Sequence, residues 1–584
     1  MKKKRKFILV ISFCILMPLM IIYILGLLSL RVFDGTYVYD ISSLYFSKEV
    51  KKIVVFVPHQ DDDLFVAGPL IYNLRNKGIE TKVVFFTDGN AHDNIGHIRQ
   101  KEAIKAQAKL GVPKKDVICM QFPNRQQGDT TDVNGVSSIS LRDSMKCAIK
   151  SIIKENKPQI IVCSDLDFNR DHRLLAILFD ESLGELLQED TYYRPVVLKG
   201  FSYQTSYNAV KDFYCMNIRS TQKPHDVQNK LYETDVPAYM WAERTRIPMS
   251  GEMATHASQT NVLYQALEEY RSQWVRDKTR SILNGDNVFW LKRSDNLLND
   301  ASVTVSSGNI GYLSDFKYYD SEDISIRHKY NLHFDNYLWE ADTTDLNPEI
   351  LVTFNSPKHV KELVLYDDPT LERNIESVDL FLNGKYFQTL ERLPEKGLPK
   401  RVYIESDGLV TSLNLKNFIC NDSLPPALVE LEIYDKPIAE YANFSILKIK
   451  SKETDDFLYR YYVPKDVNSL ELDYYAFGIS GDVTWSIYNE KGSYAKLDNS
   501  RIIFGDEFSK CTVRLSSKNN PMLYDEVVFV KESEWDSFLY SFMTTFDKCV
   551  LDFETWFYRN RIVGSFIRHT TFNPIKRFLG IKTI

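Results

Sequence analysis

One histidine and three carboxylates crowd the end of a predicted strand near the beginning of the chain. The segment VVFVPHQDDDLFVAG begins at Val54 and runs from an apolar stretch into His59, Asp61, Asp62 and Asp63. In α/β sheets, ligands bind in the crevice beyond the carboxyl ends of the strands. Imidazole and carboxylate are ligands of zinc sites that keep one position open for water or substrate. The segment therefore predicts a catalytic metal site.

A second predicted strand ends in the same way. In IIVCSDLDFNRDHRLLAI, an apolar strand leads into a polar loop and then into a helix that His172 opens. Two histidines and a carboxylate from two strand ends are sufficient for a three-ligand zinc site with an open position. Acidic residues after strands are more often helix caps, and taken singly Asp63, Asp165 and Asp171 are best interpreted in that way.

The elements that must position these residues alternate between short apolar strands and longer helical stretches. The pattern predicts strands at residues 53–57, 82–87, 117–121 and 160–163, and helices at 64–77, 97–110 and 141–155. Such alternation is typical of a Rossmann-like, mostly parallel α/β sheet with helices on both faces. The polar clusters that follow the strands, including Asp88, then meet at one edge of the sheet.

These residues resemble the PIG-L/LmbE-like N-acetylglucosaminyl deacetylase family. The first family motif reads roughly (P/A)HPDDE and the second ends in HxDH, and this chain has PHQDDD and NRDH in their places. The resemblance spans about residues 50–293. It continues through TDG at 87–89, R-x-x-E at 99–102, LG at 110–111 and YRSQ at 270–273.

The resemblance implies a hydrolase that removes N-acetyl groups from N-acetylhexosamine units. The membrane anchor and sugar-binding-like modules predicted below indicate that these units belong to a cell-envelope or secreted glycan. The resemblance also implies zinc bound by His59, Asp62 and His172, although histidine and carboxylate ligands admit other divalent ions. It further implies that Arg99 reaches the sugar, and we place Asp88 with Arg99 in the substrate-binding set.

The catalytic residues that the resemblance implies are Asp61 and Asn169. A carboxylate beside a metal-bound water can take its proton and hand it to the departing amine, which would make Asp61 the general base. Gln60 and Asp63 replace the family proline and glutamate, and Asn169 replaces the first histidine of HxDH. Asparagine can donate a hydrogen bond to an oxyanion but supplies no proton or positive charge. A catalytically weak or inactive sugar-binding protein of the same fold is therefore the alternative.

The pattern changes to short strands and turns beyond residue 293. Residues 296–437 predict a β-sandwich, with a hairpin turn at Asn383, and they resemble the discoidin-like, galactose-binding jelly roll. Trp339, Tyr337 and Tyr366 are candidates either for a sugar platform or for the core. Residues 440–532 predict a second β-sandwich, whose role stays open between spacer, partner binding and glycan binding.

Both ends of the chain carry signals for a membrane. A basic flank at residues 1–6 precedes an uncharged run at 7–30, which is long enough to span a bilayer and too long for an ordinary cleaved signal peptide. We expect an uncleaved signal anchor with the rest of the chain extracytoplasmic. Within 533–584, an amphipathic helix leads into a basic tail at 558–584, which either packs on the protein or attaches to an anionic membrane surface.

Length and composition set the outer limits of these predictions. The chain has 584 residues, of which 44% are hydrophobic and 26% charged, enough for several packed domains. Its net charge of -6 is small for this length and gives no support for nucleic acid as a partner. We therefore predict a multidomain protein: an N-terminal transmembrane helix, an α/β catalytic domain, two β-sandwich domains and a C-terminal helical tail.

Overall fold

The structure is a computed structural model in which most of residues 43–534 are described. The predicted anchor at 7–30, apart from Met17, and the predicted C-terminal helix and tail from 535 onward lie outside the described residues. Among the helices that the structure describes, none is long and apolar enough to cross a membrane. The described residues are 17, 43–90, 95–124, 139–165, 169–200, 202, 244–247, 253, 262–273, 287–317, 338–368, 373–394, 399–405, 408–421, 424–454, 457–458, 460–479 and 481–534.

A seven-stranded sheet with the order β4-β3-β2-β5-β6-β8-β7 forms the centre of the molecule. The first five strands in this order are parallel, whereas β8 runs antiparallel to both β6 and β7. The predicted parallel α/β sheet is thus confirmed, with an antiparallel extension that the pattern did not predict. The strands are β2 (Lys52–Val57), β3 (Glu80–Thr87), β4 (Val117–Phe122), β5 (Ile160–Ser164), β6 (Val196–Gly200), β7 (Arg244–Ile247) and β8 (Asn287–Lys292).

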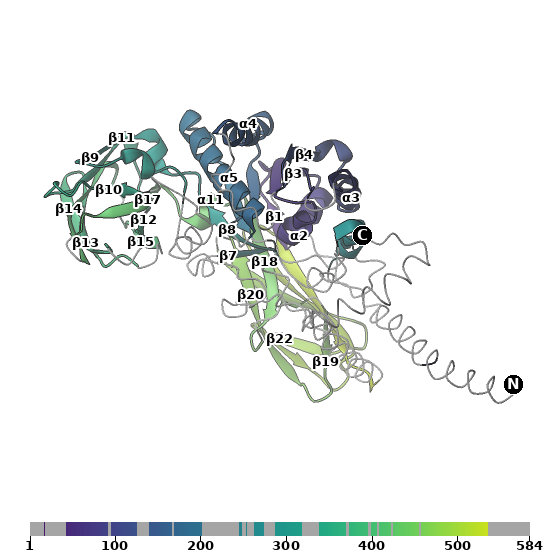
Figure 1. Ribbon diagram of the computed structural model, residues 1–584. Helices are drawn as coiled ribbons and strands as arrows, with labels where there is room; N and C mark the ends of the chain where they lie inside the picture. Colours follow the sequence, from purple (N-terminus) through teal and green to yellow (C-terminus); the bar gives the residue numbers. More distant parts are fainter. Residues whose placement is uncertain are drawn as a thin grey trace, which may run out of the picture.

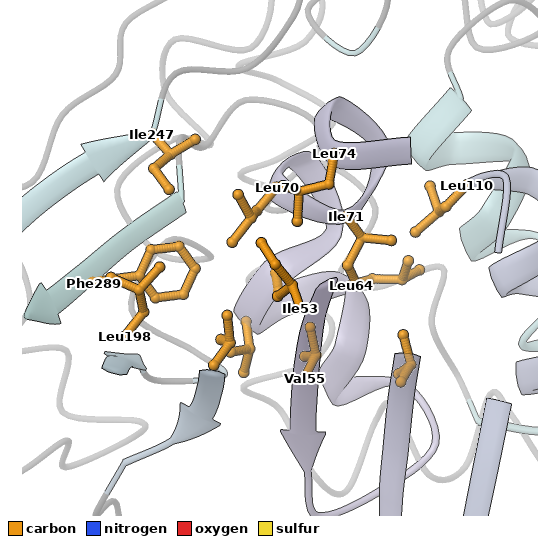
Figure 2. Packing of buried hydrophobic residues seen from close by; sticks show 14 of the residues in the cluster. Ile53, Val55, Leu64, Leu70, Ile71, Leu74, Leu110, Leu198, Ile247 and Phe289 are labelled. Carbon is orange, nitrogen blue, oxygen red and sulfur yellow. The ribbon is translucent and has the colours of Figure 1, made fainter. Parts of the chain in front are cut away.

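Helices cover both faces of this sheet because alternate strand residues are apolar on both sides. Ile53 and Val55 of β2 pack with one set of helices, and Val54 and Phe56 pack with the other. Figure 2 shows the first of these layers, in which Leu70 and neighbouring side chains of one helix lie over β2. The first set is α2 (Asp62–Asn76), α3 (Gly96–Lys109) and α8 (Val262–Leu267), and the second is α4 (Ile139–Asn156) and α5 (Arg170–Glu189).

A β-sandwich follows the central sheet in the chain and lies to one side of it (Figure 1). The predicted hairpin turn is confirmed, because Asn383 and Gly384 join β13 to β14 with φ values of 52° and 73°. Trp339 and Tyr366 are buried, so they belong to the core and not to a sugar platform, while Tyr337 lies outside the described residues. One sheet is β10 (Trp339–Glu340), β17 (Ala427–Tyr434), β12 (Glu362–Asp367) and β15 (Pro399–Tyr403); the other is β14 (Lys385–Glu391), β13 (Ile375–Leu382), β16 (Val410–Cys420), β11 (Ile350–Lys358) and β9 (Ala301–Val305).

A second β-sandwich contains a strand from the other end of the described chain. The three residues of β1 (Leu44–Phe46), which precede the central sheet, pair with β18 (Phe444–Ser451). Phe46 and Phe444 belong to the same apolar cluster as Ile53, so this sandwich and the α/β domain share one continuous core. The remaining strands are β20 (Ser469–Phe477), β23 (Arg501–Phe504) and β22 (Ala495–Asp498) in the sheet of β18, and β19 (Arg460–Val463), β25 (Tyr524–Lys531), β24 (Lys510–Ser517) and β21 (Val483–Asn489) in the facing sheet.

A buried arginine joins the α/β domain to the first sandwich. The Arg293 side chain, which follows β8, donates two hydrogen bonds to Asp295 at 2.9 and 2.6 Å and one to Glu362 at 3.3 Å. Its guanidinium carbon lies 3.6 Å from the ring centroid of Tyr434. Because Glu362 and Tyr434 belong to the sandwich, this contact fixes how the two domains meet.

Candidate active site

The predicted metal ligands come together where the strand order of the central sheet reverses. The chain leaves β2 toward β3 on one side and continues at β5 on the other, and ligands of α/β sheets bind outside the carboxyl ends of the strands at such a switch point. His59 and Asp62 follow β2, and His172 lies in the first turn of α5, which follows β5. All three side chains are buried.

The three ligand atoms fit one face of a metal coordination tetrahedron. Asp62 Oδ2 lies 3.1 Å from His59 Nδ1 and 3.2 Å from His172 Nε2, and the two nitrogens are 3.2 Å apart. Zinc–ligand bonds of about 2.0 Å in a tetrahedral site place neighbouring ligand atoms about 3.3 Å apart. The residues present therefore fit a divalent metal ion, and the fourth coordination position is left for water or substrate.

Electrostatic attraction within this cluster stabilises the carboxylate form of Asp62. Burial by itself would raise the pKa of Asp62, but the attraction and hydrogen bonds of His172 and His59 lower it well below its ordinary value. Burial likewise acts to lower the pKa of His59, but its contacts with Asp171 and Asp62 raise it overall. The site is thus ready to supply an anionic oxygen ligand.

Asp171 contacts the far side of the His59 ring, a role that the sequence did not predict. Its Oδ2 atom accepts a hydrogen bond from His59 Nε2 at 2.9 Å, which leaves Nδ1 facing the other two ligands. A carboxylate on the second nitrogen of a metal-binding histidine orients the ring and raises its basicity. The interpretation of Asp171 as a helix cap was wrong, because the N-cap of α5 is Asn169.

The position of the Asn169 side chain is set by its role as the N-cap of α5. Its Oδ1 atom accepts a hydrogen bond from the Asp171 backbone amide at 2.9 Å, which satisfies one amide at the start of α5. Its predicted contact with a reacting oxyanion stays a prediction.

Asp61, the predicted general base, lies beside the ligand cluster in an unusual backbone conformation. Its φ of 156° is rare for residues other than glycine, and it occupies the N-cap position of α2 without a side-chain capping bond. Its carboxylate is instead 3.5 Å from Arg99 Nη2. Strained conformations persist where surrounding contacts hold them, and they concentrate at functional sites.

The two predicted substrate-binding residues are both engaged with the protein. Arg99 is 9% exposed and donates hydrogen bonds to Gln273 Oε1 and, at 3.3 Å, to the Gln60 backbone oxygen. The Asp88 carboxylate accepts from the backbone amides of Asn90 at 2.9 Å and Asn124 at 3.2 Å. A sugar contact for either residue stays a prediction.

Gln60, which replaces the family proline, connects the loop that carries His59 and Asp62 to the end of β3. Its Nε2 atom donates to the Thr87 backbone oxygen at 2.9 Å. Gly89 follows in the same loop with φ of 79°, and a Cβ atom there would lie 2.5 Å from Gln60 Oε1. The close approach of the two loops therefore requires glycine at residue 89.

Asp63 is a buried structural carboxylate of the site and not a helix cap. Tyr270 donates its hydroxyl hydrogen bond to Asp63 at 2.7 Å, and Gln107 donates a second one. Burial raises the pKa of Asp63 to about 7, although these hydrogen bonds oppose the shift. The YRSQ motif was the only signal in the sequence that pointed to Tyr270.

Comparison with known proteins places the ligand residues in a recognised family. Residues 54–181 match the family described as PIG-L, GlcNAc-PI de-N-acetylase. The chain is 29% identical over 115 residues to a probable N-acetylglucosaminyl-phosphatidylinositol de-N-acetylase of Dictyostelium discoideum, and 33% identical over 107 residues to one of Schizosaccharomyces pombe. These matches cover 20% and 17% of this chain and 42% and 43% of the relatives, so the chain spans less than half the length of either relative.

Two solved structures are each similar to about a quarter of the chain. An N,N'-diacetylchitobiose deacetylase from Pyrococcus horikoshii is 22% identical, with 25% of this chain and 53% of that chain covered and a TM-score of 0.20. A family 32 CBM of C. perfringens NanJ, solved with galactose, is 13% identical, with 24% and 95% covered and a TM-score of 0.18. The match to the family model shows that the chain carries a PIG-L family domain over residues 54–181.

Proposed function

We propose that the chain is a zinc-dependent carbohydrate N-deacetylase that removes N-acetyl groups from N-acetylhexosamine units of a cell-envelope or secreted glycan. The observation that carries the proposal is the buried triad of ligand atoms from His59, Asp62 and His172, with the Asp61 carboxylate next to it in the chain. The family match and the names of both curated relatives support an N-acetyl group as the point of attack.

Each residue of the site has a separate role in amide hydrolysis. His59, Asp62 and His172 would hold the metal ion, which when bound supplies a Lewis acid and an acidified water at neutral pH. Asp61 accepts the proton of the attacking water and then delivers it to the departing amine. Asp171 keeps the His59 ring in the orientation that its ligand role needs.

A sugar-binding protein without turnover is the second candidate, and Asn169 is the observation that favours it. The Asn169 side-chain oxygen is used to cap α5, and an asparagine brings neither a proton nor a positive charge to a reacting oxyanion. In this alternative the ligand cluster and the sugar contacts persist, but acetate is not released.

Acetate release separates the two candidates. The purified, zinc-loaded protein is incubated with di-N-acetylchitobiose and with N-acetylated polysaccharides, next to an Asp61→Asn variant of matched zinc content. We expect acetate from the wild type and a loss of roughly 100-fold or more in the variant, the range for removal of a general base. Equal, background-level release of acetate from both proteins would refute the deacetylase function and favour the sugar-binding function without turnover.

The location of the enzyme is also a proposal. The uncharged run at 7–30 after a basic flank supports a signal anchor with the catalytic domain outside the cytoplasm. A glycan of the cell envelope would then be within reach of the site. Membrane fractionation with protease accessibility in intact cells tests this proposal, and a protected, soluble catalytic domain would contradict it.

A further inference from the structure

The segment Tyr270 to Gln273 contacts three separate parts of the active site. Tyr270 donates to both Asp63 carboxylate oxygens, at 2.7 and 2.8 Å, at the start of α2. Ser272 donates to Glu102 of α3 from its backbone amide at 3.0 Å and from its hydroxyl at 2.6 Å. Gln273 Oε1 accepts a hydrogen bond from Arg99. Three of these four residues thus fasten α2 and α3 at positions that lie 170 to 207 residues away in the chain.

The contact with Arg99 leads directly to the proposed general base. Arg99 Nη2, the atom that donates to Gln273, also donates to the Gln60 backbone oxygen at 3.3 Å and lies 3.5 Å from Asp61 Oδ1. Arg99 Nη1 lies 3.5 Å from the Gly89 backbone oxygen. A guanidinium is planar with its donors in fixed directions, so these acceptors together determine where its charge lies relative to Asp61.

The contact with Arg99 bears on how the Asp61 carboxylate is oriented. With φ of 156°, Asp61 occupies the N-cap position of α2 without the side-chain hydrogen bond that usually holds a cap residue there. Arg99 is buried and approaches that carboxylate from α3, an element independent of the loop that carries Asp61. A buried ion pair of this kind specifies geometry for the acidic partner.

We propose that Gln273 is a positioning residue: it holds the Arg99 guanidinium against Asp61 and so keeps the carboxylate where it can take a proton from the attacking water. The inference deepens the proposed deacetylase function and depends on it for the role of Asp61. It differs from the expectation that Arg99 serves to reach the sugar, because in that case Gln273 would affect substrate binding and not the chemical step.

Two neighbouring substitutions test the proposal in the full-length, zinc-loaded protein. Gln273→Ala removes the acceptor for Arg99. Ser272→Ala, the matched control, removes the hydroxyl hydrogen bond from the same segment to Glu102 and keeps the Gln273 acceptor for Arg99. With di-N-acetylchitobiose as substrate, we expect Gln273→Ala to lower kcat roughly 10- to 100-fold with little change in KM, the range for a small misplacement of a catalytic group. Ser272→Ala should lower the unfolding temperature but leave kcat near the wild-type value.

Thermal unfolding supplies a readout that does not depend on turnover. If Gln273 acts through Arg99 on Asp61, the unfolding shifts of Gln273→Ala and Asp61→Asn are not additive in the double variant, whereas those of Ser272→Ala and Asp61→Asn are additive. Equal zinc content in all variants shows that the ligand cluster is intact.

Three results would overturn the inference. A Gln273→Ala variant with raised KM and unchanged kcat would assign Gln273 and Arg99 to sugar binding. Equal losses of kcat in Gln273→Ala and Ser272→Ala would reduce the segment to general structural support. Additive unfolding shifts would disconnect Gln273 from Asp61. If the wild type releases no acetate, the proposed function fails, yet the unfolding measurement still decides whether Gln273 positions Asp61.

Discussion

Replacement of Asp171 by asparagine is expected to weaken zinc binding while α5, the helix that carries His172, stays intact. Asp171 Oδ2 accepts a hydrogen bond from His59 Nε2 at 2.9 Å, and both side chains are buried. Asparagine has nearly the same shape, but its amide oxygen carries no full negative charge. The His59 imidazole is then less firmly oriented and less basic as a ligand.

The size of the effect follows from this one contact. A hydrogen bond to a charged group contributes about 1.5–3 kcal/mol net. Asparagine keeps a neutral hydrogen bond of about 0.5–1.5 kcal/mol, so the charge assistance that is lost amounts to roughly 1–1.5 kcal/mol. Since about 1.4 kcal/mol corresponds to a factor of ten in a binding constant, zinc binding should weaken roughly 10-fold. The Asp171 backbone amide keeps its bond to Asn169, so the N-terminus of α5 should not unravel.

Competition with a chromophoric zinc chelator measures this affinity without reference to activity. The control is Asn169→Ala, which removes the cap of α5 at a cost of about 1 kcal/mol in stability but leaves the bond between His59 and Asp171 in place. We expect the control to bind zinc nearly as tightly as the wild type. An Asp171→Asn variant with wild-type zinc affinity would refute the assignment of His59 Nδ1 as the metal-facing atom.

Further predictions concern the domain contacts and the membrane. Phe46→Ala should destabilise the protein by about 3 kcal/mol in denaturant unfolding, because the Phe46 ring packs on Phe444, 6.0 Å away between centroids, in the shared core; an unchanged midpoint would show that β1 is dispensable. Arg293→Met should cost about 3–5 kcal/mol in the same assay, since it leaves the Asp295 carboxylate buried without its guanidinium partner and removes one of the two arginines that pair with Glu362; a neutral effect would contradict the junction described above. Deletion of 7–30 together with the tail from 558 onward should abolish membrane binding, and complete release by deletion of 7–30 alone would exclude the tail as a second attachment.

The elements around the site were predictable because their signals are local. The apolar runs before His59 and before the NRDH motif specify buried parallel strands, and parallel strands carry their following residues to one edge of the sheet. The bounds of α2, α3 and α4 likewise follow from helical periodicity and differ from the predicted ones by one or two residues. Residue types at strand ends were therefore enough to bring His59, His172 and a neighbouring carboxylate to one edge of the sheet, and the family resemblance identified Asp62 as that carboxylate.

The features that escaped prediction depend on contacts between distant segments. The β1 strand has three residues and pairs with β18 about 400 residues later, a contact that no local pattern specifies. Asp171 follows the local pattern of a helix cap, but its carboxylate is used by His59, which follows a different strand. Trp339 and Tyr366 lie in alternating strands whose pattern does not say which face is covered, and burial of both became evident only from the packed sandwich.

The most direct test of the proposed metal-dependent deacetylase activity is a zinc titration of the chelator-treated protein with acetate release as the readout. The arrangement of His59, Asp62 and His172 predicts no release from the metal-free protein and full recovery at one zinc ion per chain, with no recovery in a His172→Ala variant. Acetate release from the metal-free wild type at the zinc-loaded rate would contradict the account.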